Sequence, residues 1–193
     1  MTLPQLLVPL VAAVFTLTAA ADERPAAWAR PIAVAGAQNL HQVSKDLYRS
    51  AQPTNEGLVG LEKLGVRTVL NLRSFNSDRG ELKGTKLNYV HLTMKAWHPE
   101  HKEAVAFLKL VSDPSKTPVL VHCQHGADRT GAMCAIYRVA VQGWTKEEAV
   151  REMTDGGYGF HEVWQNLPAW IDGLDIAALR KEAKIPEPPA GKP

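Results

Sequence analysis

Short apolar runs alternate along this chain with segments in which apolar residues recur every three or four positions. The apolar runs predict short strands at residues 39–43, 47–50, 66–72, 87–92 and 118–121. The helical spacing predicts helices at residues 54–64, 102–111, 130–141, 145–154, 161–167 and 169–183. Helices that alternate with short strands predict an α/β fold, with a central, mostly parallel sheet flanked by helices.

Several boundaries are marked by residues that complete or interrupt backbone hydrogen bonding. Thr54 is expected to cap the first helix and Gly65 to end it. Thr145 and Glu148 have the spacing of a capping box, which predicts the start of another helix. Pro168 is expected to separate the last two helical segments, because proline interrupts helix hydrogen bonding.

The two ends of the chain differ from the rest. Residues 1–21 hold an apolar run followed by small residues, although no Lys or Arg precedes the run. This pattern predicts a signal peptide cleaved after Ala21, and hence a periplasmic or secreted protein; a retained membrane anchor is the alternative. Residues 22–38 predict an extended lead-in, residues 39–184 one folded domain, and residues 185–193 a disordered Pro-rich tail.

Composition narrows the function classes. A chain of 193 residues with 45% apolar content is long enough for one domain with a full core, and we expect a monomer. The net charge of +2 gives no reason to expect a nucleic-acid partner. Cys123 and Cys134 are the only cysteines, so no disulfide framework supports the fold, and Cys134 is expected to be a small buried residue.

The clearest chemical signal lies between the predicted strand at 118–121 and the helix that follows it. The loop begins with Cys123 and ends with Arg129, and five residues separate them. Backbone N–H groups at a helix N-terminus bind anions, and this field together with a guanidinium favours a cysteine thiolate. Gly126 allows close approach of the backbone, and Thr130 can place a hydroxyl near the sulfur. These parts suit attack of a thiolate on a phosphate monoester through a cysteinyl-phosphate intermediate.

This pattern, His-Cys-x5-Arg-Thr-Gly at residues 122–131, resembles the signature of the cysteine-dependent protein tyrosine phosphatase superfamily. Residues 47–53, 68–73 and 137–149 are also similar to bacterial members of its dual-specificity branch, and the resemblance covers roughly residues 40–170. It implies the cysteine phosphatase fold over residues 39–184 and a phosphorylated protein as substrate. It also implies that residues 50–53 approach the signature loop.

Other interpretations of the loop fit less well. Rhodaneses have four residues between Cys and Arg, and arsenate reductases of the low-molecular-weight phosphatase type carry the loop near the chain start. A buried structural cysteine would not explain Gly126, Arg129 and Thr130 at this spacing. Cys123 is therefore the predicted nucleophile and Arg129 the predicted oxyanion ligand. The expected substrate-binding residues are Gln124, His125, Gly126, Ala127, Thr130 and, beyond the end of a predicted strand, Arg73.

A phosphatase must protonate its leaving group, and the source of that proton is open. In the resembled families an Asp provides it, on a loop before the cysteine, but residues 93–101 contain no Asp. Asp128, inside the signature, is our first candidate for the catalytic acid. Glu100 and His98 are alternatives, although Glu100 could instead stabilise a helix N-terminus.

We expect neither a cofactor nor a metal, because the few His and Cys residues match no common closed zinc site. Protein phosphotyrosine is the first expected substrate, with dual specificity open. Phosphoinositides or inositol phosphates come second, because they favour additional cations and the loop has only Arg129. A phosphate-binding pseudophosphatase is a more distant alternative, since the nucleophile is intact.

Overall fold

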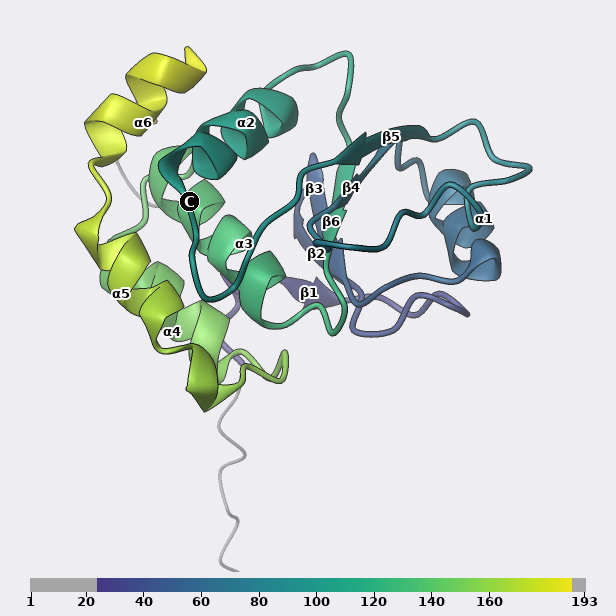
Figure 1. Ribbon diagram of the computed structural model, residues 1–193, viewed down its shortest axis with the longest axis horizontal. Coiled ribbons are helices and arrows are strands. Elements are labelled where there is room, and N and C mark those ends of the chain that lie inside the picture. Colours follow the sequence, from purple (N-terminus) through teal and green to yellow (C-terminus); the bar gives the residue numbers. More distant parts are fainter. Residues whose placement is uncertain (1–23, 189–193) are drawn as a thin grey trace, which may run out of the picture.

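The computed structural model describes residues 24–188 and shows a six-stranded sheet with one helix on one face and the remaining helices on the other (Figure 1). The predicted signal peptide and the last five residues of the predicted tail lie outside the described residues. The strands are β1 (Arg30–Pro31), β2 (His41–Ser44), β3 (Leu47–Ser50), β4 (Thr68–Asn71), β5 (Asn88–His91) and β6 (Val119–His122). The helices are α1 (Asn55–Lys63), α2 (His101–Val111), α3 (Asp128–Ala140), α4 (Lys146–Asp155), the 3-10 helix η1 (Glu162–Trp164), α5 (Asn166–Gly173) and α6 (Ile176–Ala183).

The sheet has the order β1-β2-β3-β6-β4-β5. Its central strands β3, β6, β4 and β5 pair in parallel, whereas β1 and β2 add antiparallel pairs at one edge. Every residue of β3, β4 and β6 is buried, as expected for parallel strands covered on both faces. The predicted α/β fold with a mostly parallel centre is confirmed.

The two faces of the sheet are covered by different helices. Leu120 of β6 belongs to one core cluster, together with Leu58 and Leu61 of α1. Its neighbours Val119 and Val121 point to the other face and belong to the cluster that includes α2–α6. Figure 1 shows α1 on one side of the sheet and the remaining helices on the other.

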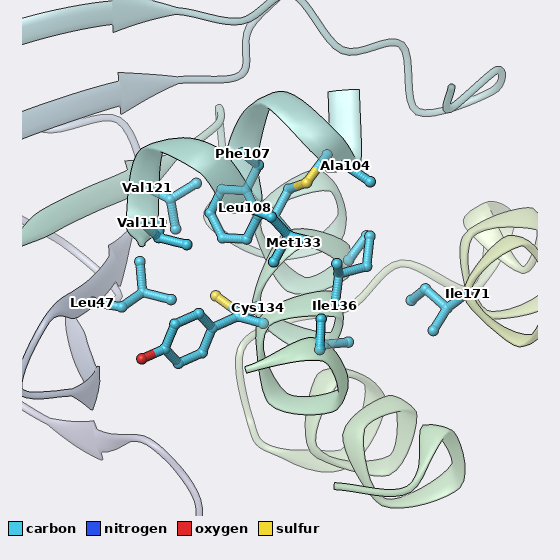
Figure 2. Packing of buried hydrophobic residues seen from close by; sticks show 14 of the residues in the cluster. Leu47, Ala104, Phe107, Leu108, Val111, Val121, Met133, Cys134, Ile136 and Ile171 are labelled. Carbon is cyan, nitrogen blue, oxygen red and sulfur yellow. The ribbon is translucent and has the colours of Figure 1, made fainter. Parts of the chain in front are cut away.

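Helix α3 is the centre of the larger helical layer, and nearly all of its residues are buried. Figure 2 shows Met133 of α3 beside Phe107 and Leu108 of α2, and Ile136 turned toward Ile171 of α5. Cys134 of α3 is also buried, as predicted, and burial raises the pKa of its thiol to about 11. Because packing holds α3 on all sides, its N-terminus is fixed where it follows the signature loop.

The predicted caps at Thr54 and Thr145 are confirmed, but the prediction for Pro168 was wrong. Pro168 lies in the first turn of α5, where a backbone N–H has no helical partner and its loss costs little. The break between the last two helices falls instead at Asp175, whose side chain caps α6.

The predicted extended lead-in contributes β1 to the sheet. Among the described residues, none of the helices has the length and apolar character needed to cross a membrane.

Candidate active site

The signature loop, residues 123–129, connects the C-terminal end of β6 to the first turn of α3. The parallel strands β3 and β4 flank β6, so the residues that follow all three strands meet at one edge of the sheet. Helix α3 has 13 residues and begins at Asp128, so the last two residues of the loop belong to its first turn. The partial positive charge at its N-terminus is therefore directed at the loop interior.

Three successive carbonyl groups of the loop bind donors outside it. The carbonyl of Gln124 accepts a bond of 3.1 Å from the backbone N–H of Gln52. That of His125 accepts one of 3.1 Å from Asn39 Nδ2, and that of Gly126 one of 2.7 Å from Arg49 Nη2. In a trans peptide the N–H points opposite to the carbonyl, so the N–H groups of residues 125–127 turn toward the loop interior. Such a ring of donors binds a tetrahedral oxyanion.

Gly126 is required by this arrangement. Its φ is +71°, a conformation that residues with a side chain rarely adopt. A Cβ atom there would lie 2.5 Å from the carbonyl carbon and oxygen of Ser50 and from the N atom of Ala51. The structure thus gives Gly126 a second reason beyond the expected close approach to an anion, namely its close packing against the end of strand β3, while Ala127 is buried beside it.

A buried polar network lies below Cys123, which is only 1% exposed. The preceding residue, His122, is 2.8 Å from Asp78 through Nε2 and 3.1 Å from the carbonyl of Cys123 through Nδ1. A carboxylate and a carbonyl are both acceptors, so both contacts are hydrogen bonds only when His122 carries hydrogens on both nitrogens. Asp78 also accepts a bond of 2.9 Å from Gln52 Nε2. These contacts hold the His122 side chain in place directly before the predicted nucleophile.

Two guanidinium groups reach the site. Arg129 lies in the first turn of α3, and its Nη1 is 3.5 Å from the carbonyl oxygen of Leu72 and 3.4 Å from that of Met94. Arg73 follows β4 and donates a bond of 2.6 Å to Gln52 Oε1. The structure thus brings Arg73 and Arg129 together, as predicted from their places in the sequence. The hydroxyl of Thr130 is buried and has no hydrogen-bond partner among residues 24–188, so the expected contact with the Cys123 sulfur is not a hydrogen bond here.

A cavity of about 450 Å³ opens above the loop. Gln124, His125, Asp128 and Arg129 contribute to its lining, together with Arg73 and His161. Three of its exposed lining residues are large and apolar and are called the apolar rim here: Phe75, Trp97 and Val163 are 89%, 60% and 77% exposed. These large exposed side chains surround the opening, so a ligand with an apolar group next to its phosphate would contact them.

The three acid candidates lie in different environments. Glu100 caps α2 and forms a 2.7 Å ion pair with Lys102, whose hydrogen bond and charge lower the pKa of Glu100. Neither Glu100 nor His98 lines the cavity, although Ala96 and Trp97 of the same loop do. The carboxylate of Asp128 lines it and accepts a bond of 2.9 Å from the backbone N–H of His161. The ring Nδ1 of His161 is 3.0 Å from the other carboxylate oxygen.

Potential metal-ligand atoms gather at one place among the described residues. Single atoms of His125, Asp128 and His161 lie within 4.8 Å of one another. A metal ion between them would have to replace the direct Asp128–His161 contact. In this structure the three side chains interact with one another, since the rings of His125 and His161 also pack with centroids 5.2 Å apart.

Sequence reasoning missed four residues that shape the site: Asn39, Arg49, Asp78 and His161. Asn39 has a positive φ of 54°, and its Nδ2 donates to the carbonyl oxygens of both His125 and Tyr158. Arg49 lies in a buried strand, and a charged residue in that position was the one available signal. Asp78 lies in the polar, glycine-containing segment 76–85, a composition typical of surface loops, yet its side chain is buried. His161 approaches Asp128 only through the folding of α4 against α3.

A strand, an anion-binding loop that starts with cysteine, and a helix that starts beside arginine define the class of cysteine-dependent phosphatases. Comparisons with known proteins support the same class. The family model "DSP-PTPase phosphatase fused to NAD+ Kinase" matches residues 27–165, and the chain belongs to this family, within the cysteine-dependent protein tyrosine phosphatase superfamily. The resemblance stated from the signature is confirmed, and the chain is a phosphatase of this superfamily.

The relatives include proteins whose names indicate different substrates. The chain is 37% identical over 161 residues to the dual specificity protein phosphatase TpbA of Pseudomonas aeruginosa strain UCBPP-PA14, covering 83% of this chain and 72% of that protein. A crystal structure of P. aeruginosa TpbA, 33% identical, matches with a TM-score of 0.74 and covers 83% of this chain and 99% of that one. The inositol diphosphatase DSP3 of Arabidopsis thaliana is 27% identical over 152 residues, covering 74% of this chain and 73% of that protein.

Proposed function

We propose that this protein hydrolyses protein phosphotyrosine through a cysteinyl-phosphate intermediate. The proposal rests mainly on three successive carbonyl groups of the loop, which accept hydrogen bonds from donors outside it. Because these carbonyls point outward, the N–H groups of the loop point inward, toward a phosphate bound above Cys123. Arg129 adds a planar pair of donors for two phosphate oxygens. The Cys123 thiolate then forms the S–P bond as the ester P–O bond breaks.

The apolar rim supports an aromatic phosphate ester over a polyphosphate. A phosphotyrosine ring would leave the loop between Phe75, Trp97 and Val163, which lie exposed around the opening. An inositol polyphosphate would need many cations, but Arg73 and Arg129 are the only Arg or Lys residues among those that line the cavity. Aromatic rings stack favourably with one another, by roughly 0.5–1.5 kcal/mol per pair beyond simple burial.

The relatives support both candidates to different degrees. A cysteine-to-serine variant of P. aeruginosa TpbA has been crystallised in complex with phosphotyrosine, and it matches this chain with 33% identity and a TM-score of 0.74. The name of DSP3, at 27% identity, gives inositol diphosphatase activity for that protein. Hydrolysis of inositol phosphates is therefore the second candidate function here, and simple phosphate binding without turnover is the third.

The test compares substrates on one purified protein covering residues 22–193. We expect turnover of a phosphotyrosine peptide to exceed that of phosphoserine and phosphothreonine peptides and of an inositol pyrophosphate. Cys123→Ser should remove all turnover. Trp97→Ala should raise KM several-fold for both the phosphotyrosine peptide and p-nitrophenyl phosphate, because both place an aromatic ring beside Trp97, and should leave KM for the phosphoserine peptide nearly unchanged. Preferential turnover of the inositol pyrophosphate would overturn the proposed substrate.

We further propose that the protein is exported and acts as a monomer on a phosphorylated protein. The support is the apolar run in residues 1–21 and the small residues that end it at Ala21. Expression of the full chain in a Gram-negative bacterium should give a periplasmic protein whose N-terminal residue is Asp22. Recovery in the cytoplasm with Met1 intact would contradict export, and light scattering would measure the mass in solution.

A further inference from the structure

The loop that carries the catalytic acid in related phosphatases has no Asp here, so another group must protonate the leaving oxygen. Of that loop, Ala96 and Trp97 reach the cavity, and neither side chain is an acid. The cavity has titratable groups on a different segment. His161 follows the glycine-containing turn after α4 and lines the cavity together with Arg129 and Asp128. Figure 1 shows the segment between α4 and α5 below the N-terminal end of α3.

The contacts of His161 fix the orientation of its ring. Its backbone N–H donates to Asp128 Oδ1 at 2.9 Å, and its ring Nδ1 lies 3.1 Å and 3.0 Å from the two oxygens of the same carboxylate. With Nδ1 turned to Asp128, Nε2 is on the opposite side of the ring. The His161 side chain is 47% exposed, whereas that of Asp128 is only 9% exposed. The imidazole is therefore the more accessible member of the pair.

We propose that His161 is the general acid of this phosphatase and that Asp128 is the residue that positions it. This inference rests on the phosphatase chemistry proposed above. As Cys123 Sγ forms its bond to phosphorus, the P–O ester bond breaks and its electron pair goes to the leaving oxygen. Nε2 of the His161 imidazolium gives its proton to that oxygen, which leaves as a phenol. Neutral His161 then takes a proton from the water that breaks the S–P bond, so inorganic phosphate leaves and both groups are restored.

The arrangement follows a known division of roles between carboxylate and imidazole. A carboxylate bound to Nδ1 orients the ring and stabilises its charged form, while Nε2 exchanges the proton with the substrate. The charged or titratable residues that line the cavity together with His161 are Asp128 and Arg129 of α3, His125 of the signature loop and Arg73 beyond β4. Asp128 is the one anion among them, and it makes the direct contacts.

The test uses His161→Asn, because the Asn amide can still donate to Asp128 from the position of Nδ1 but has no proton to offer at Nε2. We compare kcat/KM, which reports formation of the cysteinyl-phosphate and not its hydrolysis, and for phenyl phosphate, whose leaving group needs protonation, it should fall about 10²-fold. With p-nitrophenyl phosphate, whose leaving group does not, we expect a fall of less than about fivefold. The matched control is His101→Asn, which removes another half-exposed His paired with a carboxylate, Glu182 at 3.1 Å. It should change neither rate.

The pH profiles of kcat/KM for phenyl phosphate separate His161 from Asp128. Wild-type kcat/KM should fall on the alkaline side as His161 loses its proton, and His161→Asn should lack this alkaline limb. Asp128→Asn should keep the limb, because the imidazole that carries the proton is still present. All assays contain EDTA, so that a metal ion bound by His125, Asp128 and His161 has no influence.

Equal losses for the two esters in His161→Asn, or an unchanged alkaline limb, would overturn the proposal. A limb that disappears in Asp128→Asn and persists in His161→Asn would assign the acid to Asp128 instead. These outcomes do not depend on the natural substrate, because both esters are small. Failure of the proposed function would appear separately, as wild-type turnover of aryl phosphates without turnover of the phosphotyrosine peptide. A wild-type protein inactive on every ester would overturn both.

Discussion

Replacing Asp78 with Asn should destabilise the protein and slow its catalysis, although Asp78 does not line the cavity. Asp78 and His122 are both 0% exposed and form a 2.8 Å ion pair. His122 in turn contacts the carbonyl of Cys123 at 3.1 Å, and Asp78 binds Gln52, which holds Arg73. One buried carboxylate therefore connects the start of the signature loop to the second guanidinium of the site.

The size of the expected stability loss follows from the number of hydrogen-bond acceptors at position 78. Asp78 accepts from Gln52 Nε2 at 2.9 Å and from His122 Nε2 at 2.8 Å, and Asn has only one acceptor oxygen. One contact is lost, and an amide donor faces another donor. A hydrogen bond to a charged group contributes about 1.5–3 kcal/mol, and a buried charge left without its partner costs about 3–5 kcal/mol. We expect a loss of about 3 kcal/mol in the free energy of unfolding, which lowers Tm by about 6–12 °C.

The loss should depend on pH in a defined direction. Burial alone would raise the pKa of Asp78, but the hydrogen bond and charge of His122, with Gln52 and Arg73, hold it below its usual value. A carboxyl with a lower pKa in the folded chain contributes stability above its unfolded pKa, and the contribution disappears as the pH falls through the folded pKa. The difference between wild type and Asp78→Asn should be constant near neutral pH and shrink below about pH 4.

Urea unfolding from pH 3 to pH 8 measures this difference, and kcat for p-nitrophenyl phosphate at pH 6 should fall about tenfold because the loop start is less well positioned. The control is Asp46→Asn, which removes a carboxylate that is 36% exposed and whose partner Lys45 is 3.3 Å away and 89% exposed. Its effect should be under about 1 kcal/mol. An Asp78→Asn variant as stable as the control, or a difference that grows toward acid pH, would refute this account of the buried pair.

Three further predictions concern the loop, the core and the second cysteine. Gly126→Ala should reduce kcat/KM at least about 10²-fold, since a Cβ would lie 2.5 Å from the backbone of Ser50; activity within threefold of wild type would contradict this. Arg138→Met should lower the free energy of unfolding, measured in urea, by about 3–5 kcal/mol, because Glu152 loses its buried partner at 2.6 Å. The double variant Arg138→Met with Glu152→Leu should recover part of this loss, because no buried carboxylate is then left unpaired. Iodoacetamide at pH 7 should label Cys123 and not Cys134, whose pKa burial raises to about 11; peptide mapping would show the site.

Most of the fold was predicted from patterns of residues that are close to one another in the sequence. The strand at 47–50 was placed correctly, and the caps at Thr54 and Thr145 followed from side chains that bond within three residues. Helix α3 starts two residues earlier than predicted, at Asp128, because the loop passes into it without a separate cap. The helix break was wrongly predicted at Pro168. Proline interrupts a helix only beyond the first turn, and a spacing pattern does not determine where the helix begins.

The candidate site was predictable only where its parts are adjacent in sequence. Cys123, Gly126 and Arg129 lie within one loop, and their spacing is informative by itself. Asn39, Asp78 and His161 reach that loop from segments 33 to 86 residues away in the chain. Asp78 occurs among polar residues that look like a surface loop, and its burial depends on tertiary packing. The pairing of His161 with Asp128 likewise depends on the path of the chain after α4.

The most direct test of the central claim is detection of the covalent intermediate. Wild-type protein is mixed with a phosphotyrosine peptide, quenched in acid during turnover and mapped by mass spectrometry. The account predicts one phosphoryl group on the peptide that contains Cys123, absent in Cys123→Ser and absent from the peptide that contains Cys134. Turnover of the substrate without a phosphoryl group on Cys123, or a phosphoryl group on another residue, would contradict it.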